Sequence, residues 1–166
     1  MCGAQLGATV VAEEVHKTVT VVFSDLKGST PLAERLDTET LRDVLNQYFN
    51  TMRAVLERHA GTVEKYIGDA IMAVFGLPRL HEDDALRAVR AAAEMQQELV
   101  RINAQFEEIY GVRLENRTGV NTGEVVAGDV SVGHRLVTGD TVNVAAGWSS
   151  RRRRWRSCSG RPPTAS

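Results

Sequence analysis

The chain has 166 residues, a net charge of -1 at pH 7, a hydrophobic fraction of 43% and a charged fraction of 25%. This composition is ordinary for a globular protein, and the length is sufficient for one domain with a hydrophobic core. The near-neutral charge argues against a chain that binds nucleic acid over its whole surface.

The cysteine pattern and the apolar runs indicate the compartment. Cys2 and Cys158 lie at opposite ends and have neither metal-ligand spacing nor the spacing of a disulfide framework, so we expect a reducing environment. No apolar run approaches membrane-spanning length, and no signal peptide is visible. We therefore expect a cytoplasmic protein without a membrane segment.

The most informative stretch is Val19–Pro31, with the sequence VTVVFSDLKGSTP. Its alternating β-branched start predicts a buried β-strand that ends in Asp25. A short glycine-containing loop follows, and Pro31 suits the first residue of a helix capped by Ser29 or Thr30. A carboxylate can hold a hard cation, and N–H groups at a helix start can hold phosphate, so this stretch suggests a metal–polyphosphate site. The alternative is that Asp25 only begins a turn.

The next segment predicts a helix over residues 38–60, after a shorter helix over residues 31–36. Gly61 is expected to end the longer helix as a C′ glycine. Apolar residues at helical spacing predict its buried face: Leu41, Val44, Leu45, Tyr48, Phe49, Met52, Val55 and Leu56.

Residues 62–76, with the sequence TVEKYIGDAIMAVFG, predict a β-hairpin. Gly68 and Asp69 separate two apolar runs and are typical of a tight hairpin turn. If the hairpin lies beside the first strand, Asp69 and Asp25 meet. Two adjacent carboxylates repel unless a cation joins them, and two Mg²⁺ ions bridged by both would suit phosphoryl chemistry. The alternative is that Asp69 is only a turn former.

A second long helix is expected over residues 84–108. The acidic run before it is interpreted as capping that complements the helix dipole, and His81 as a solvated loop residue. The predicted apolar stripe comprises Ala85, Ala88, Val89, Ala92, Met95, Leu99, Ile102 and Phe106.

The remaining pattern predicts more strands. We expect a strand over residues 112–121, a turn at 122–124, a short returning strand over 125–127, another strand near 136–137 and a helix from Thr141. The order β-α-β-β-α-β fits an α+β fold of the ferredoxin-like, split βαβ type, in which helices cover one face of a sheet that contains antiparallel strands.

Four segments together resemble one known family. FSDLKGST, VEKYIGDAIMAVFG, RTGVNTGEVVAG and LVTGDTVNVAA resemble, in order, the signature segments of the class III adenylate/guanylate cyclase catalytic domain. The resemblance covers about Lys17 to Ala146 and is strongest to the bacterial branch that carries ATPase, TPR or zinc-ribbon regulatory regions.

The resemblance implies roles for individual residues. Asp25 and Asp69 match the two metal-binding aspartates, Lys65 matches the lysine that reads the purine, and Asn143 matches the asparagine that holds the nucleotide. The turn that cradles the triphosphate corresponds to Leu26, Lys27, Gly28, Ser29 and Thr30. Without the family context, Lys65 reads as a solvated charge and Asn143 as a hydrogen-bonding residue at a helix start.

The implied reaction is the conversion of ATP to 3′,5′-cyclic AMP and pyrophosphate, with two Mg²⁺ or Mn²⁺ ions per site. The implied assembly is a head-to-tail homodimer in which Asp25 and Asp69 come from one subunit and Lys65 and Asn143 from the other. A monomer would lack a complete site.

Two positions depart from the family pattern. Leu136 stands where an Asp or Thr usually helps to select adenine, so GTP is not excluded as the substrate. Gly147 stands where an arginine usually stabilises the transition state. Loss of such a donor costs about 100- to 1,000-fold in rate.

We expect a leader or linker over residues 1–16, an incomplete catalytic domain over 17–146 and a basic, disordered tail over 147–166. The tail has six arginines and no acidic residue, and our hypothesis is that it is translated out of frame after Ala146. The alternatives are a non-catalytic dimerisation or nucleotide-sensing module, favoured by Leu136 and Gly147, and a nucleic-acid binder that uses the tail.

Overall fold

A computed structural model describes residues 15–127, 137–138 and 145 of the chain. Its elements follow the expected β-α-β-β-α-β order with additions. They are β1 (Val15–Lys27), α1 (Ser29–Arg35), α2 (Thr38–Arg58), β2 (Thr62–Ile67), β3 (Ala70–Phe75), α3 (Asp84–Tyr110), β4 (Glu115–Ala127) and β5 (Val137–Thr138).

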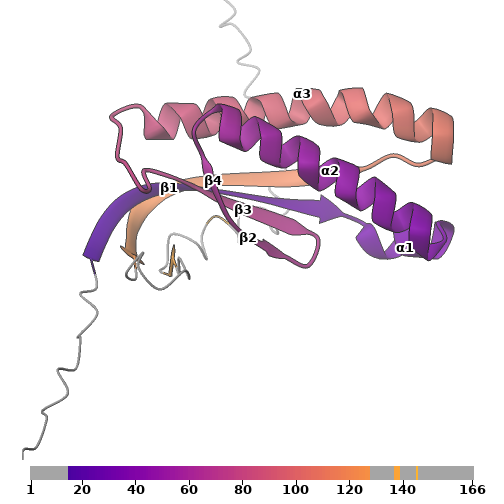
Figure 1. Cartoon of the computed structure of the whole chain (residues 1–166), viewed down its shortest axis with the longest axis horizontal. Coiled ribbons are helices and arrows are strands. Elements are labelled where there is room, and N and C mark those ends of the chain that lie inside the picture. The colour runs from indigo at the N-terminus through magenta and orange to yellow at the C-terminus, as the bar shows by residue number, and fades with distance from the viewer. Residues whose placement is uncertain (1–14, 128–136, 139–144, 146–166) are drawn as a thin grey trace, which may run out of the picture.

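The five described strands form one sheet. Its strand order is β2-β3-β1-β4-β5, and every neighbouring pair is antiparallel. Figure 1 shows α2 and α3 on the same side of this sheet, side by side along its length. The expected α+β fold with helices on one sheet face is therefore confirmed.

The two faces of the sheet carry different residues because side chains alternate along a strand. The larger core cluster lies between the sheet and the two long helices, and its largest fully buried side chains are Tyr48, Phe75 and Phe106. The predicted buried face of α2 is confirmed by Val44, Tyr48, Met52, Val55 and Leu56. A smaller cluster covers the opposite face and includes Val21, Phe23, Met72 and Val74.

The first strand is longer than expected. β1 continues past Asp25 to Lys27 because β4 pairs with it as far as Lys27 and Glu115. Only Gly28 separates β1 from α1, and it takes the N-cap position with a φ of 76°. The expectation of a Ser29 or Thr30 cap was wrong, because the short connection requires a left-handed residue, which glycine adopts at little cost.

The turn expected at residues 122–124 is also absent. β4 is one continuous strand from Glu115 to Ala127, and each of its residues has a partner on β1. A long neighbouring strand offers backbone hydrogen bonds along its whole length, and this outweighs the local turn preference of the Thr-Gly pair. The strand expected near residues 136–137 corresponds to β5, which the structure describes at residues 137–138.

The start of α3 differs in detail from the prediction. Asp83 occupies the N-cap position without a side-chain cap bond, whereas the buried Asp84 carboxylate accepts the main-chain N–H of His81 at 2.8 Å. His81 is exposed, as expected. Two members of the predicted stripe, Ala85 and Val89, are exposed, whereas Ala91 and Asn103 are buried, so the buried face of α3 is shifted around the helix relative to the prediction.

At the end of α2, the left-handed residue is not the expected one. Ala60, not Gly61, has the positive φ, 61°. Gly61 is required for space instead, because a Cβ there would lie 2.5 Å from the Phe75 ring. The C′ assignment of Gly61 was therefore wrong.

This exchange gives a prediction with opposite signs. We expect Ala60→Gly to raise the free energy of unfolding by about 1 kcal/mol, because it removes left-handed strain. Gly61→Ala should lower it by about 1–3 kcal/mol, because the methyl group overpacks the core against Phe75. Urea denaturation of both variants measures the two values, and a stabilised Gly61→Ala protein would contradict the packing argument.

Candidate active site

The hairpin turn brings the two predicted metal ligands together. Asp25 pairs with Ala70 of β3, and Asp69 directly precedes Ala70 in the β2–β3 turn. The Leu26 N–H donates to the Asp69 carbonyl oxygen at 3.3 Å. The meeting of Asp25 and Asp69, expected from the sequence, is thus present, and the two carboxyl groups are close enough for Asp69 to raise the pKa of Asp25.

The electrostatics of this pair favour a bound cation. Burial raises the pKa of Asp25 most, the neighbouring Asp69 carboxylate raises this pKa further, and the Arg117 guanidinium opposes both effects. The ionised form of Asp25 is therefore disfavoured without a cation. A divalent ion between the carboxylates would remove the repulsion.

Two carboxylates suit a hard cation whose remaining coordination positions are filled by other oxygen ligands. Within the described part of the chain, no group of three or more His, Cys, Asp or Glu side chains could hold a metal ion. Asp25 and Asp69 would therefore supply two carboxylates, and water or substrate phosphates the rest. Mg²⁺ is commonly bound in this way, through one or two carboxylates and phosphate oxygens.

Arg117 is the site residue that the sequence analysis missed. It lies on β4 directly opposite Asp25 in the strand register, and its positive charge lowers the pKa of Asp25. The sequence shows Arg117 as a basic residue within a predicted strand, but only the β1–β4 register reveals that it lies opposite Asp25. A cation beside the two carboxylates is well placed to attract a polyphosphate.

The predicted phosphate-binding turn lies next to the carboxylates but is shorter than expected. Leu26 and Lys27 belong to β1, and Leu26 is buried in the helix-side core. Gly28 forms the turn, while Ser29 and Thr30 open α1. The exposed main chain at Gly28 is therefore the part of the predicted turn that a ligand can approach closely.

The predicted purine-binding residues are apart from the carboxylates or outside the described residues. Lys65 lies on the edge strand β2 and pairs with Met72 of β3. Met72 in turn pairs with Phe23 of β1. Two strand spacings, about 10 Å, thus separate Lys65 from the strand of Asp25, on the same sheet face. Asn143, together with Leu136 and Gly147, lies outside the described residues.

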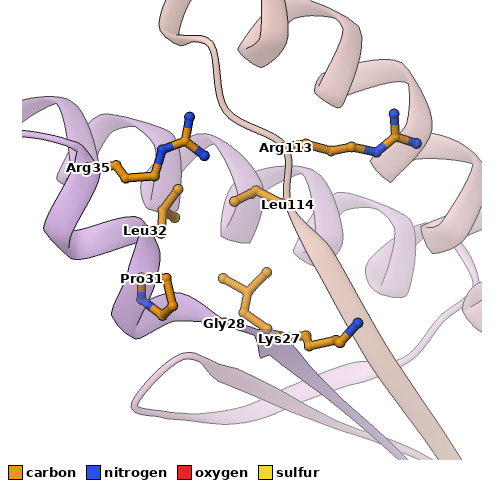
Figure 2. Close-up of a pocket in the computed structure, with 8 residues that line it drawn as sticks. Lys27, Gly28, Pro31, Leu32, Arg35, Arg113 and Leu114 are labelled. Atoms are coloured by element: carbon orange, nitrogen blue, oxygen red, sulfur yellow. The ribbon is translucent and has the colours of Figure 1, made fainter.

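A separate small pocket of about 170 Å³ adjoins the turn on the α1 side. Figure 2 shows it between α1 and the start of β4, and its lining residues are Leu26, Lys27, Gly28, Pro31, Leu32, Arg35, Arg113 and Leu114. Its basic side chains already have partners: a main-chain carbonyl for Arg35 and carboxylates for Lys27 and Arg113. We therefore do not assign the nucleotide to this pocket.

The aspartate pair formed by Asp25 near the end of β1 and Asp69 in the hairpin turn could hold a divalent cation next to the Gly28 turn. The family model described as "Adenylate and Guanylate cyclase catalytic domain" matches residues 11–153. The chain therefore belongs to the adenylate and guanylate cyclase catalytic domain family. The resemblance found in the four sequence segments is confirmed.

Known relatives include cyclases of both substrate types. The terminal-differentiation-specific adenylate cyclase of Dictyostelium discoideum is 32% identical over 82% of this chain, which spans 6% of that protein's length. The guanylyl cyclase Cya2 superposes with a TM-score of 0.77 at 38% identity, covering 82% of this chain and 71% of that chain. The adenylyl cyclase CyaB of P. aeruginosa has a TM-score of 0.76 at 34% identity, covering 81% and 71%.

The described helices also bear on membrane association. Within residues 15–127, 137–138 and 145, no helix is both long enough and apolar enough to cross a lipid bilayer.

Proposed function

We propose that the chain is a nucleotide cyclase domain that converts ATP to 3′,5′-cyclic AMP and pyrophosphate. The observation that carries this proposal is the contact between Asp25 and Asp69 beside the Gly28 turn, in a chain of this family. In the reaction, the ribose 3′-oxygen bonds to the α-phosphorus while the bond from that phosphorus to the β-phosphate bridging oxygen breaks. The 3′-hydroxyl proton leaves to solvent, and pyrophosphate departs.

Each residue group has a distinct task in this proposal. Asp25 and Asp69 would hold two divalent ions, Mg²⁺ or Mn²⁺, which when bound lower the pKa of the 3′-hydroxyl and neutralise charge at the phosphates. The residues Leu26–Thr30 would hold the triphosphate, and Arg117 would draw it toward the carboxylates. Lys65 would read the purine, and Asn143 would orient the nucleotide.

We further propose a head-to-tail homodimer in the cytoplasm, with a catalytic domain over residues 17–146, a leader over 1–16 and a basic tail over 147–166. The position of Lys65, two strands from Asp25, supports a site to which the second subunit contributes the purine-binding residues.

The test compares cyclic AMP and cyclic GMP formation from ATP and GTP with Mg²⁺ or Mn²⁺. We expect Gly147→Arg to raise the rate by about 100- to 1,000-fold, because it restores a charged donor for the transition state. An Asp25→Ala chain serves as the inactive control. Equal rates for the chain and its Gly147→Arg variant would contradict the assigned role of position 147.

The second candidate function is a non-catalytic dimerisation or nucleotide-sensing module, favoured by Gly147 in place of the expected arginine. Folded protein that binds ATP but yields no cyclic product in either form would support this candidate instead.

A further inference from the structure

Directly behind Asp25, on the helix-covered face of the sheet, polar side chains from β1, α2, α3 and β4 are joined by hydrogen bonds. We call this set the Ser24 network; its members are Ser24, Tyr48, Gln96, Asn116 and Thr118.

The contacts of the network converge on Ser24 and Asn116. The hydroxyls of Ser24 and Thr118 lie 3.0 Å apart. Asn116 Nδ2 donates to Ser24 Oγ at 3.2 Å and to Tyr48 Oη at 3.3 Å. From α3, Gln96 Nε2 donates to Asn116 Oδ1 at 2.7 Å and to Thr118 Oγ1 at 3.3 Å. Both long helices are thereby tied to the same point of the β1–β4 pair.

The network reaches from an otherwise apolar core to its edge: Asn116 and Thr118 are half-buried, and Gln96 is exposed. Ser24 and Tyr48 are both 0% exposed, among side chains such as Val22 and Leu26 that form the helix-side cluster. Burying polar groups costs free energy unless each is hydrogen-bonded, whereas apolar residues of similar size would pack there without that requirement. A satisfied polar network gains register specificity, because a shifted strand would leave its members unpaired.

The network lies near the end of the β1–β3 pairing, beside Asp25. The β1–β3 register ends at Asp25 and Ala70, and the Leu26 N–H bond to the Asp69 carbonyl follows it. Ser24 directly precedes Asp25 on β1. On β4, Thr118 lies opposite Ser24, and Arg117 lies opposite Asp25. Because Ser24 and Asp25 are consecutive residues, any displacement of the Ser24 backbone would also displace Asp25, whose side chain lies on the opposite face of the sheet.

We infer that the Ser24 network positions Asp25 for cation binding, with Thr118, Asn116 and Tyr48 as positioning residues. This inference rests on the proposed function, since it assumes that Asp25 and Asp69 hold the ion. The electrostatics agree with the placement: burial raises the pKa of Tyr48 most, hydrogen bonds to Asn116 and Ser24 lower it, and the charges of Asp25 and Asp69 raise it.

The same two strands contain a natural control. Thr20 Oγ1 and Thr122 Oγ1 lie 2.8 Å apart, also on the helix-covered face of the β1–β4 pair. Thr122→Val and Thr118→Val thus remove the same atom from the same strand, and each breaks a hydroxyl pair with β1. Thr118 is opposite Ser24, the residue before Asp25, whereas Thr122 is opposite Thr20, which lies earlier in β1 and away from Asp25.

The test measures Mn²⁺ binding to the full chain by electron paramagnetic resonance of the free ion, with thermal unfolding in parallel. We expect Thr118→Val to weaken Mn²⁺ binding by about tenfold, the low end for residues that orient metal ligands, and Thr122→Val to change it by less than about twofold. Tyr48→Phe, which keeps the ring and removes only the hydroxyl, should weaken binding in the same direction.

The outcomes separate this inference from the proposed function. Loss of Mn²⁺ binding in Asp25→Asn together with unequal effects of Thr118→Val and Thr122→Val supports the positioning role. Equal effects of the two threonine variants, or a Tyr48→Phe protein that binds Mn²⁺ like the original chain, overturn it while the Asp25 site stands. Unchanged Mn²⁺ binding in Asp25→Asn overturns the proposed metal site itself, and the positioning role with it.

Discussion

Replacing Asp25 by asparagine should lower the rate of nucleotide cyclisation by about 100- to 1,000-fold, the largest effect on catalysis that we expect from one described residue. The amide keeps the shape of the side chain but removes the negative charge that would hold the cations beside Asp69. The rate of cyclic nucleotide formation at saturating Mn²⁺ measures this loss. A variant that retains a tenth or more of the activity would contradict the assignment of Asp25 as a metal ligand.

The same substitution should stabilise the metal-free fold. The pKa of Asp25 is raised in the folded state, so the folded chain binds the proton more tightly than the unfolded chain does. Stability is therefore lost as the pH rises from the unfolded value of 3.8 through the folded pKa. Asp25→Asn removes this penalty, so its melting temperature at pH 7 should equal or exceed that of the original chain. A lower melting temperature would show that the activity loss reflects misfolding.

Mixing two variants that are each impaired should restore part of the activity. In the proposed head-to-tail dimer, each site takes Asp25 from one subunit and Lys65 from the other. We expect Lys65→Ala to lower kcat/KM by about 10- to 100-fold, because a charged hydrogen bond to the purine is lost. An equal mixture with Asp25→Asn should recover about one quarter of the parent rate, because half of the dimers contain one intact site of two.

The mixing experiment is best done with the Gly147→Arg chain as the parent, in which the expected rate is higher. Its control is a mixture of Asp25→Asn with Asp69→Asn, which lie together in one subunit and should not complement. Recovery in the control mixture, or none in the Lys65 mixture, would contradict the shared site.

The sequence predicted the structure correctly where the conformation depends on residues close together in the chain. Gly68 and Asp69 formed the predicted two-residue turn because glycine tolerates its positive φ, here 61°, and because two β-forming runs flank it. The apolar spacing of α2 likewise predicted its buried face. The meeting of Asp25 with Asp69 followed once the hairpin was placed beside β1.

Predictions failed where a neighbouring strand or ring decided the conformation. The turn at residues 122–124 did not form because β1 offers partners to every residue of β4. Ala60 has the left-handed φ, and Gly61 is required instead for space, because it lies against Phe75 where no side chain fits.

The sequence by itself thus determined the family, the order of elements and the two carboxylates, because these depend on residue types and spacing along the chain. The tertiary structure decided that Arg117 faces Asp25 and that Ser24 is tied to Asn116 and Thr118 behind it. These residues are about 90 positions apart in the chain, and no periodicity relates them. Only the register between β1 and β4, set by long-range backbone pairing, brings them together.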